Sequence, residues 1–171
     1  NLRNFLGSID IGLHLTLTDQ LTPISLPILA PSGQLPSFRH LLTRAFLRNL
    51  PLDEIRNLVN VQILEFKKTM GCMPDFVDGH HHVHQLPGVR EILIEILLEV
   101  PKSERPYLRS TLENWPVTMS RGIAVGKVGG LNILGSKFRQ LTDQSQLQRN
   151  RGFAGVYDLN DRTPYAELFP K

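Results

Sequence analysis

Four of the six histidines of the chain lie within one short segment, residues 78–84, whose sequence is DGHHHVH. In an extended backbone the side chains alternate between two faces, so Asp78, His80, His82 and His84 would share one face. Neutral imidazole is the commonest metal-donor side chain, and sets of histidine and carboxylate suit zinc or a similar divalent ion with an open coordination position. The segment therefore predicts a metal site, against the alternative of a solvent-exposed, histidine-rich turn.

A further candidate ligand, His14, lies far earlier in the chain. From Ile9 to Thr18 apolar residues alternate with polar residues or glycine, which predicts a strand that carries His14 on its polar face. Asp10 shares that face and is a weaker candidate, because two strand residues place it roughly 6.6 Å away along the backbone. If the two segments meet, imidazoles from both could bind one ion.

The residues around these histidines have predicted supporting roles. We expect Asp78 to accept a hydrogen bond from a ligand imidazole and fix its tautomer, although it could simply be a turn residue before a glycine. His82 and His84 are expected to line a substrate pocket or orient ligands, whereas His81 would point the other way and pack in the wall. Arg109 is a candidate for gripping substrate oxygens or a carboxylate, with an ordinary surface arginine as the alternative.

The segments that must position these residues alternate between strand and helix patterns. Residues 19–36 are rich in proline and predict a long loop. Residues 37–50 have mixed helical periodicity, and residues 52–68 predict a helix with Ile55, Leu58, Val59 and Leu64 on one apolar stripe.

The pattern continues with a second strand that enters at residues 74–79 and runs into the histidines. A helix over 87–100 follows, apolar nearly all round and therefore expected between two layers, then a short strand at 107–109 and weak helical patterns over 118–150. Tyr107 and Trp115 are aromatic side chains that could stack on a sugar ring, although isolated aromatic residues more often belong to the core. The order strand, helix, strand, helix, strand implies parallel pairing and an α/β fold.

Composition limits the class of protein. The chain has 171 residues, 41% apolar and 20% charged, which fits one globular domain. A net charge of +3 is too small for the footprint of a nucleic-acid binder, and no apolar run is long enough to predict a membrane span. The single cysteine, Cys72, excludes an internal disulfide framework, so we expect a reducing, cytoplasmic location.

Two segments together resemble the paired motifs of the YdjC-like carbohydrate deacetylases, the group that contains chitooligosaccharide deacetylase. They are residues 12–18, GLHLTLT, and residues 78–89, DGHHHVHQLPGV; residues 108–109 and 152–157 are weaker landmarks. The resemblance implies a distorted (β/α) TIM-type barrel that uses a divalent metal, Mg or Zn, to activate water and remove N-acetyl groups from acetylated sugars. In that family the metal is held by an aspartate from an Asp-Asp-Phe-Gly motif and two histidines, which correspond here to His14 and His80.

The sequence departs from the family pattern at two points. It contains no Asp-Asp-Phe-Gly motif and no C-terminal Cys-His-Pro motif, so the catalytic residues stay unassigned. Barrels of this class typically need about 250 residues. We therefore expect residues 1–171 to form a single deacetylase-like domain that is incomplete at both ends, the central part of a barrel and inactive alone.

Several alternatives stay open at this point. The chain could be a natural remnant rather than a fragment, and an unpaired edge strand would favour self-association as a homodimer. It could be a sugar- or metal-binding module that has lost its catalytic groups. It could also be a metal hydrolase of another amide or ester, because the same activated water attacks any suitable carbonyl.

Overall fold

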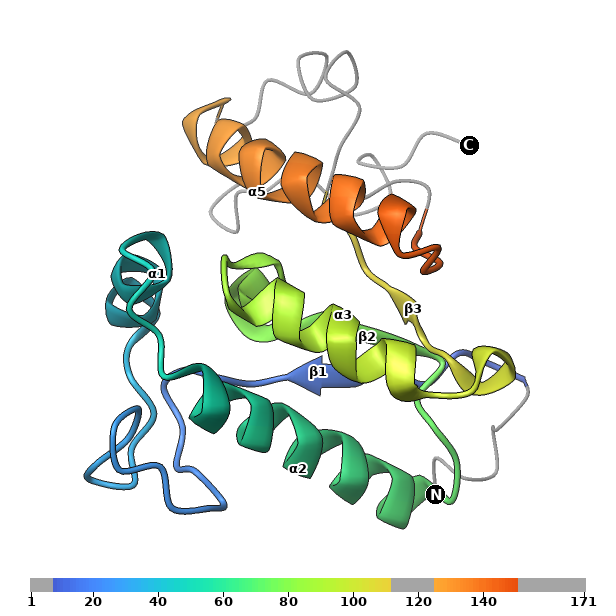
Figure 1. Ribbon diagram of the computed structural model, residues 1–171, viewed down its shortest axis with the longest axis horizontal. Coiled ribbons are helices and arrows are strands. Elements are labelled where there is room, and N and C mark those ends of the chain that lie inside the picture. The colour runs from blue at the N-terminus through green and yellow to red at the C-terminus, as the bar shows by residue number, and fades with distance from the viewer. Residues whose placement is uncertain (1–7, 112–124, 151–171) are drawn as a thin grey trace, which may run out of the picture.

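The computed structural model describes residues 8–111 and 125–150, which form a small parallel sheet covered by helices (Figure 1). The sheet has the strand order β1-β2-β3. Its strands are β1 (Leu13–Leu15), β2 (Phe76–Gly79) and β3 (Tyr107–Leu108). The helices are α1 (Phe38–Phe46), α2 (Leu52–Met70), α3 (Val89–Glu99) and α5 (Val125–Gln144), with the short 3-10 helices η2 (His80–Gln85) and η3 (Lys102–Glu104).

The sheet confirms the predicted α/β class and the parallel pairing. His14 of β1 pairs with Asp78 of β2, and Val77 of β2 pairs with Leu108 of β3. Because the strands are parallel, their carboxyl ends meet at one edge of the sheet, where the two histidine motifs come together. The described strands are three and short, so they establish a mixed α/β architecture and not a closed barrel.

The first strand is shorter than the expected span from Ile9 to Thr18. The Thr16 N–H donates to Gln62 Oε1 at 2.9 Å, and Gln62 Nε2 donates to the Thr16 carbonyl at 2.9 Å. The backbone groups of Thr16 therefore bond to a side chain of α2 instead of a neighbouring strand. Alternation of side chains indicated which residues point inward, but the length of the strand depends on these partners.

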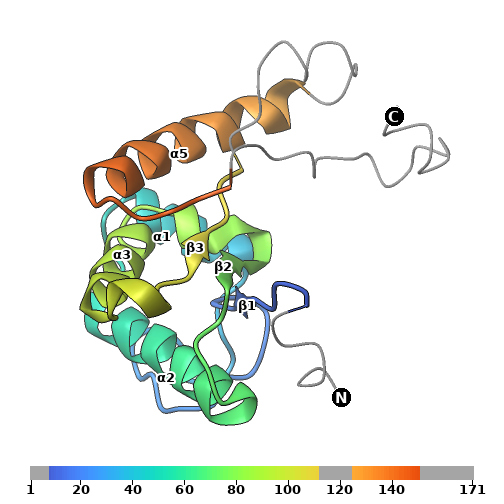
Figure 2. The same cartoon turned by 90° about the vertical axis from the view of Figure 1, so that its right-hand side faces the viewer.

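Helix α3 lies between α2 and α5, as its nearly uniform apolar composition predicted (Figure 1). Figure 2 shows α2 and α3 on the same side of the sheet. The helix begins at Val89, two residues after the predicted start, because the Glu91 carboxylate accepts a hydrogen bond from the Gly88 N–H. The weak helical pattern of residues 118–150 is confirmed over the span of α5, whereas Trp115 and residues 152–157 lie outside the described residues.

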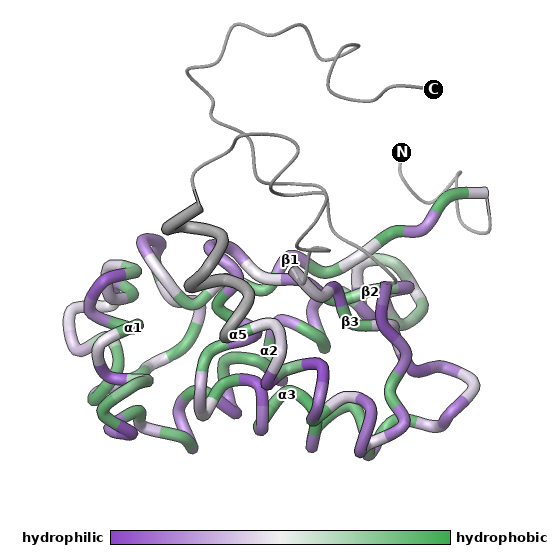
Figure 3. The backbone as a smooth tube through the Cα atoms, turned by 90° about the horizontal axis from the view of Figure 1, so that it is seen from above, coloured by the Kyte–Doolittle hydropathy of each residue, from purple (hydrophilic) through white to green (hydrophobic). Residues whose placement is uncertain are grey.

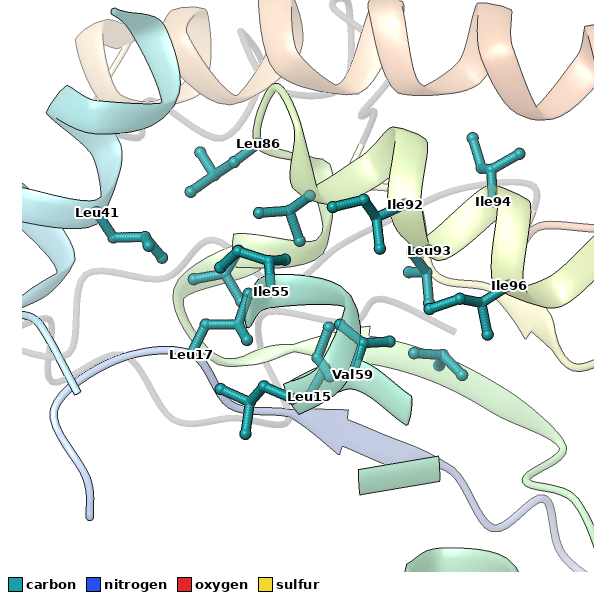
Figure 4. Close-up of a cluster of buried hydrophobic side chains, with 14 of the residues drawn as sticks. Leu15, Leu17, Leu41, Ile55, Val59, Leu86, Ile92, Leu93, Ile94 and Ile96 are labelled. Atoms are coloured by element: carbon teal, nitrogen blue, oxygen red, sulfur yellow. The ribbon is translucent and has the colours of Figure 1, made fainter. Parts of the chain in front are cut away.

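The core is formed between the sheet and these helices. Buried side chains from β1, α2 and α3 meet there, among them Leu15, Ile55, Val59 and Leu93 (Figure 4). On α2 the predicted stripe is correct for Ile55 and Val59 but wrong for Leu64, which is 62% exposed. Ile63 is buried in its place, because it lies one helical turn after Val59.

The helices that pack on the core carry both hydrophobic and hydrophilic residues. Figure 3 shows hydrophilic and hydrophobic residues alternating along the tube through α2 and α3, as expected for helices with one face in a core. Within the part of the chain that the structure describes, no helix is long and apolar enough to cross a membrane.

The end of α2 depends on a left-handed residue, Gly71, which has φ +83° and donates its N–H to the Lys67 carbonyl at 2.8 Å. A Cβ at this position would meet no atom within 4 Å, so a substitution changes only the backbone preference. We expect Gly71→Ala to lower the free energy of unfolding by about 1 kcal/mol. Gly71→Asn should cost less, because asparagine adopts the left-handed region more readily. Urea unfolding measures both, and an alanine variant as stable as the wild type would contradict the expectation.

Candidate metal centre

The centre of the site is a hydrogen-bonded pair between neighbouring strands. His14 Nδ1 lies 2.7 Å from Asp78 Oδ1, and the two side chains are 58% and 11% exposed. Since an ionised carboxylate only accepts hydrogen bonds, Nδ1 of His14 carries the proton and donates it. In the neutral ring Nε2 is then unprotonated, which is the state in which histidine binds metals.

Asp78 has a second partner on its other oxygen. Arg109 Nη1 donates to Asp78 Oδ2 at 2.8 Å. Burial acts to raise the pKa of Asp78, but the hydrogen bonds from His14 and Arg109 and the charge of the guanidinium outweigh it and hold that pKa below its usual 3.8. Asp78 is therefore ionised at neutral pH, and the carboxylate that Arg109 grips belongs to the protein itself.

His80 lies directly after β2 and next to His14. The centroids of the two rings are 5.7 Å apart, in an edge-to-face arrangement. Partial burial lowers the pKa of His80, and the neighbouring His81 and His14 lower it further. The two segments predicted to meet thus do meet, and the His80 ring is kept in its neutral form.

The backbone of the histidine cluster differs from the expected strand. Extended structure ends at Gly79, and the next residues form η2, in which His81 (φ 52°) and His82 (φ 58°) adopt left-handed conformations. The expectation that His80, His82 and His84 point to one side of an extended strand is therefore wrong. The change of direction brings the His84 side chain close to Gly79. A Cβ atom built at Gly79 would lie 2.9 Å from the Nδ1 of His84.

His84 is fully buried and presents no surface to a substrate. Its Nε2 lies 2.7 Å from the Arg109 carbonyl, so Nε2 carries the proton, while Nδ1 is buried without a hydrogen-bond partner among the described residues. Burial lowers the pKa of His84 to about 4. The ring therefore connects η2 to the segment after β3 as a neutral hydrogen-bond donor.

The degree of burial of His82 is intermediate between that of His84, which is buried, and that of His81, which is exposed. His82 is half-buried, its ring centroid is 6.5 Å from that of His84, and burial together with the charge of Arg109 lowers its pKa. Unlike His84, it keeps enough exposure to contact a bound molecule.

His81 does not pack in a wall, as was expected, but is exposed beside His80. Their ring centroids are 3.9 Å apart, and the Phe38 ring lies 5.0 Å away on α1. His81 Nδ1 is 3.8 Å from Oδ2 of Asp19, a residue of the long loop. Asp19, His80 and His81 offer ligand atoms that all lie within 4.8 Å of one another. Sequence reasoning did not find Asp19, although it directly follows the GLHLTLT segment.

Two residues with weaker functional candidacies, Asp10 and Tyr107, contact each other within the protein. Asp10 accepts a hydrogen bond from the Tyr107 hydroxyl at 3.2 Å, instead of joining His14. The Tyr107 ring stacks on Phe76 with centroids 5.5 Å apart, which agrees with packing inside the protein, the alternative to stacking on a sugar.

Comparison with known proteins identifies relatives over most of the chain. A family model described as YdjC-like protein matches residues 1–168. The chain is 41% identical over 92 residues to a chitooligosaccharide deacetylase of Proteus mirabilis (strain HI4320), covering 53% of the chain and 35% of the relative. It is 27% identical over 154 residues to a chitooligosaccharide deacetylase of Enterobacter sp. (strain 638), covering 86% and 59%. It is 32% identical over 99 residues to a carbohydrate deacetylase of Mus musculus, covering 53% and 31%. The chain thus spans between about a third and three fifths of the length of these relatives.

Proposed function

Because the chain belongs to the YdjC-like family, we propose that it is part of a metal-dependent hydrolase that removes N-acetyl groups from acetylated sugars. The observation that carries this proposal is the meeting of His14 and His80, from two distant segments, beside the ionised Asp78. Relatives named chitooligosaccharide and carbohydrate deacetylases support an acetylated sugar, such as an N-acetylated chitooligosaccharide, as the substrate class.

The side chains present fit a divalent cation, Mg²⁺ or Zn²⁺, with His14 and His80 as proposed ligands. Both are accessible imidazoles, and the hydrogen bond to Asp78 gives His14 the tautomer with an unprotonated Nε2. When bound, such an ion polarises an amide carbonyl and lowers the pKa of water from 15.7 toward ~7.

The remaining residues of the site act on the ligands and on the substrate. Asp78 holds the His14 ring in place, and Arg109 holds Asp78 through its second oxygen. We assign His82 to the wall of the sugar pocket, since it is half-buried, and His84 to the support of η2. The catalytic acid and base are not assigned to residues of this chain.

The proposal extends to the fold and the assembly. We place residues 1–171 in one deacetylase-like domain, as part of a distorted (β/α) TIM-type barrel. Support comes from His80, which directly follows the carboxyl end of β2, and from His14 on the neighbouring strand β1, because the active sites of such barrels lie at the carboxyl ends of the strands. In the described sheet β1 has a strand neighbour on one side only, which supports further pairing there, by more of the barrel or by a second copy.

Acetate release by the complete protein tests this function. We expect release from N-acetylated chitooligosaccharides, loss of that release after treatment with a chelator, and recovery when Mg²⁺ or Zn²⁺ is returned. Release that survives chelation would contradict a metal-dependent hydrolase. Binding of the sugar without release of acetate would favour the alternative, a binding module of the same fold.

A further inference from the structure

A carboxylate and two imidazoles gather where the histidine cluster meets the first residue of the long loop. The ligand atoms of Asp19, His80 and His81 lie within 4.8 Å of one another, and Asp19 Oδ2 is 3.8 Å from His81 Nδ1. We propose that these three residues bind a divalent transition-metal ion. The inference builds on the proposed function only in sharing His80; Asp19 and His81 have no role in that function.

The backbone holds Asp19 in place at the base of the long loop. Its N–H donates to the Pro36 carbonyl at 3.1 Å, and in the next pair the Leu35 N–H donates to the Gln20 carbonyl at 2.8 Å. These bonds close the loop over residues 19–36. The Asp19 carboxylate is therefore presented by a fixed backbone, so less conformational entropy is lost when it binds a ligand.

The two histidines are presented by a backbone that brings consecutive side chains together. His81 has φ 52°, and its ring lies over that of His80 with centroids 3.9 Å apart. In an ordinary strand, neighbouring side chains would point to opposite faces and could not share an ion. Phe38 supports the outer side of the His81 ring at 5.0 Å.

The chemistry of the three groups selects the class of ion. Two imidazoles and one carboxylate, with positions left for water, form the donor set that suits Zn²⁺, Co²⁺ and similar ions better than Mg²⁺. With metal–ligand bonds of roughly 2.0–2.2 Å, tetrahedral ligand atoms lie roughly 3.5 Å apart. The observed separations, 3.8 Å for Asp19 and His81 and at most 4.8 Å within the cluster, therefore have to close by at most roughly 1.3 Å. The exposed side chains of Asp19 and His81 achieve this by rotation about their χ angles.

This site differs from the proposed family site in its carboxylate and in one of its two histidines. Asp78 is already engaged on both oxygens, by His14 and by Arg109. Asp19 has an exposed side chain, and its carboxylate lies near another candidate ligand, His81. The two sites share His80, so a test must separate them by removing residues that belong to one site alone.

Co²⁺ binding to the full chain in a His14→Ala background provides that test, followed by visible absorption and titration calorimetry. We expect the His14→Ala protein to keep a Co²⁺ site with imidazole ligands. Adding Asp19→Asn or His81→Asn should then raise the Kd for Co²⁺ by at least ~10-fold, the smallest effect usual for a residue that supports a metal ligand. Asparagine at position 81 tolerates the left-handed backbone, so the fold is retained.

Matched controls are the exposed residues His40 and Glu99, changed to His40→Gln and Glu99→Gln in the same background. We expect them to leave the Kd unchanged. Loss of all Co²⁺ binding in the His14→Ala protein, or equal Kd values with and without Asp19 and His81, would overturn the proposal. Either result leaves metal-dependent acetate release by the wild-type protein in place, so failure of this site and failure of the proposed function are told apart.

Discussion

Replacing His14 with alanine in the complete protein is expected to lower kcat/KM for acetate release by at least about 100-fold. The change removes a proposed ligand and leaves Asp78 facing Arg109 alone. Loss of a residue that only supports a ligand typically costs 10- to 100-fold in metal affinity or activity, so loss of the ligand should cost at least the upper value. Initial rates of acetate release, measured with Mg²⁺ and Zn²⁺ in turn, give the size of the effect.

Asp78→Asn tests the residue that supports the ligand His14, whereas His14→Ala tests the ligand itself. The asparagine has nearly the same shape, but it loses the charge that fixes the His14 tautomer and pairs with Arg109. We expect a loss of about 10- to 100-fold, with metal affinity and activity falling together. His40→Ala serves as the control for both variants, because His40 is an exposed histidine of α1.

A His14→Ala enzyme as active as the His40→Ala control would exclude His14 as a ligand.

The order of helices and strands could be predicted from the sequence because it depends on local periodicity. The stripe through Ile55 and Val59 reflects the one face of α2 that packs in the core. The uniform apolar character of α3 reflects its packing between two other helices. The length of β1 could not be predicted in the same way. Its end depends on Gln62, a side chain 46 residues away that bonds both backbone groups of Thr16.

The candidate site likewise has features that could be predicted from the sequence and features that could not. The types and density of residues in the histidine cluster indicated a ligand-rich segment, and the parallel pairing of β1 with β2 then brought His14 beside Asp78. The turn at His81 and His82 was not visible in the pattern, because a histidine-rich run does not show where extended structure stops. The turn accompanies the burial of Val83 and His84, which is a tertiary effect.

Asp19 shows the limit most clearly. Proline density indicated a loop after β1, and the loop is present. Nothing local indicated that bonds such as those from Asp19 to Pro36 and from Leu35 to Gln20 would close this loop and bring its first carboxylate to His81. A contact between two non-adjacent loop segments depends on the whole fold, so only the structure could supply it.

Acidification is expected to destabilise the protein through His84 by about 2–3 kcal/mol between pH 7 and pH 4.5. Burial lowers the pKa of this ring to about 4 in the folded state, whereas a histidine in the unfolded chain titrates near pH 6.5. Between these two values the unfolded state binds more protons than the folded state. The free energy of unfolding therefore falls as the pH drops from 6.5 toward 4, and no further loss comes from this group below its folded pKa.

The ionised carboxylate of the site and the other histidines of the cluster affect the acid range differently. The pKa of Asp78 is lowered from 3.8, so its stabilising charge is lost only at still lower pH. His80 and His82 have lowered pKa values too and add a slope of the same sign, which a variant at position 84 leaves in place.

His84→Gln isolates the contribution of the buried ring. The glutamine amide can donate to the Arg109 carbonyl, as Nε2 of His84 does, but it does not take up a proton in this range. Urea unfolding at a series of pH values should therefore show a shallower acid loss for His84→Gln than for the wild type, whereas His40→Gln should follow the wild-type curve. Parallel curves for wild type and His84→Gln would mean that the buried ring is not kept neutral by the fold. The same result would also contradict the role given to His84, in which its neutral ring holds η2 in place through the hydrogen bond to the Arg109 carbonyl.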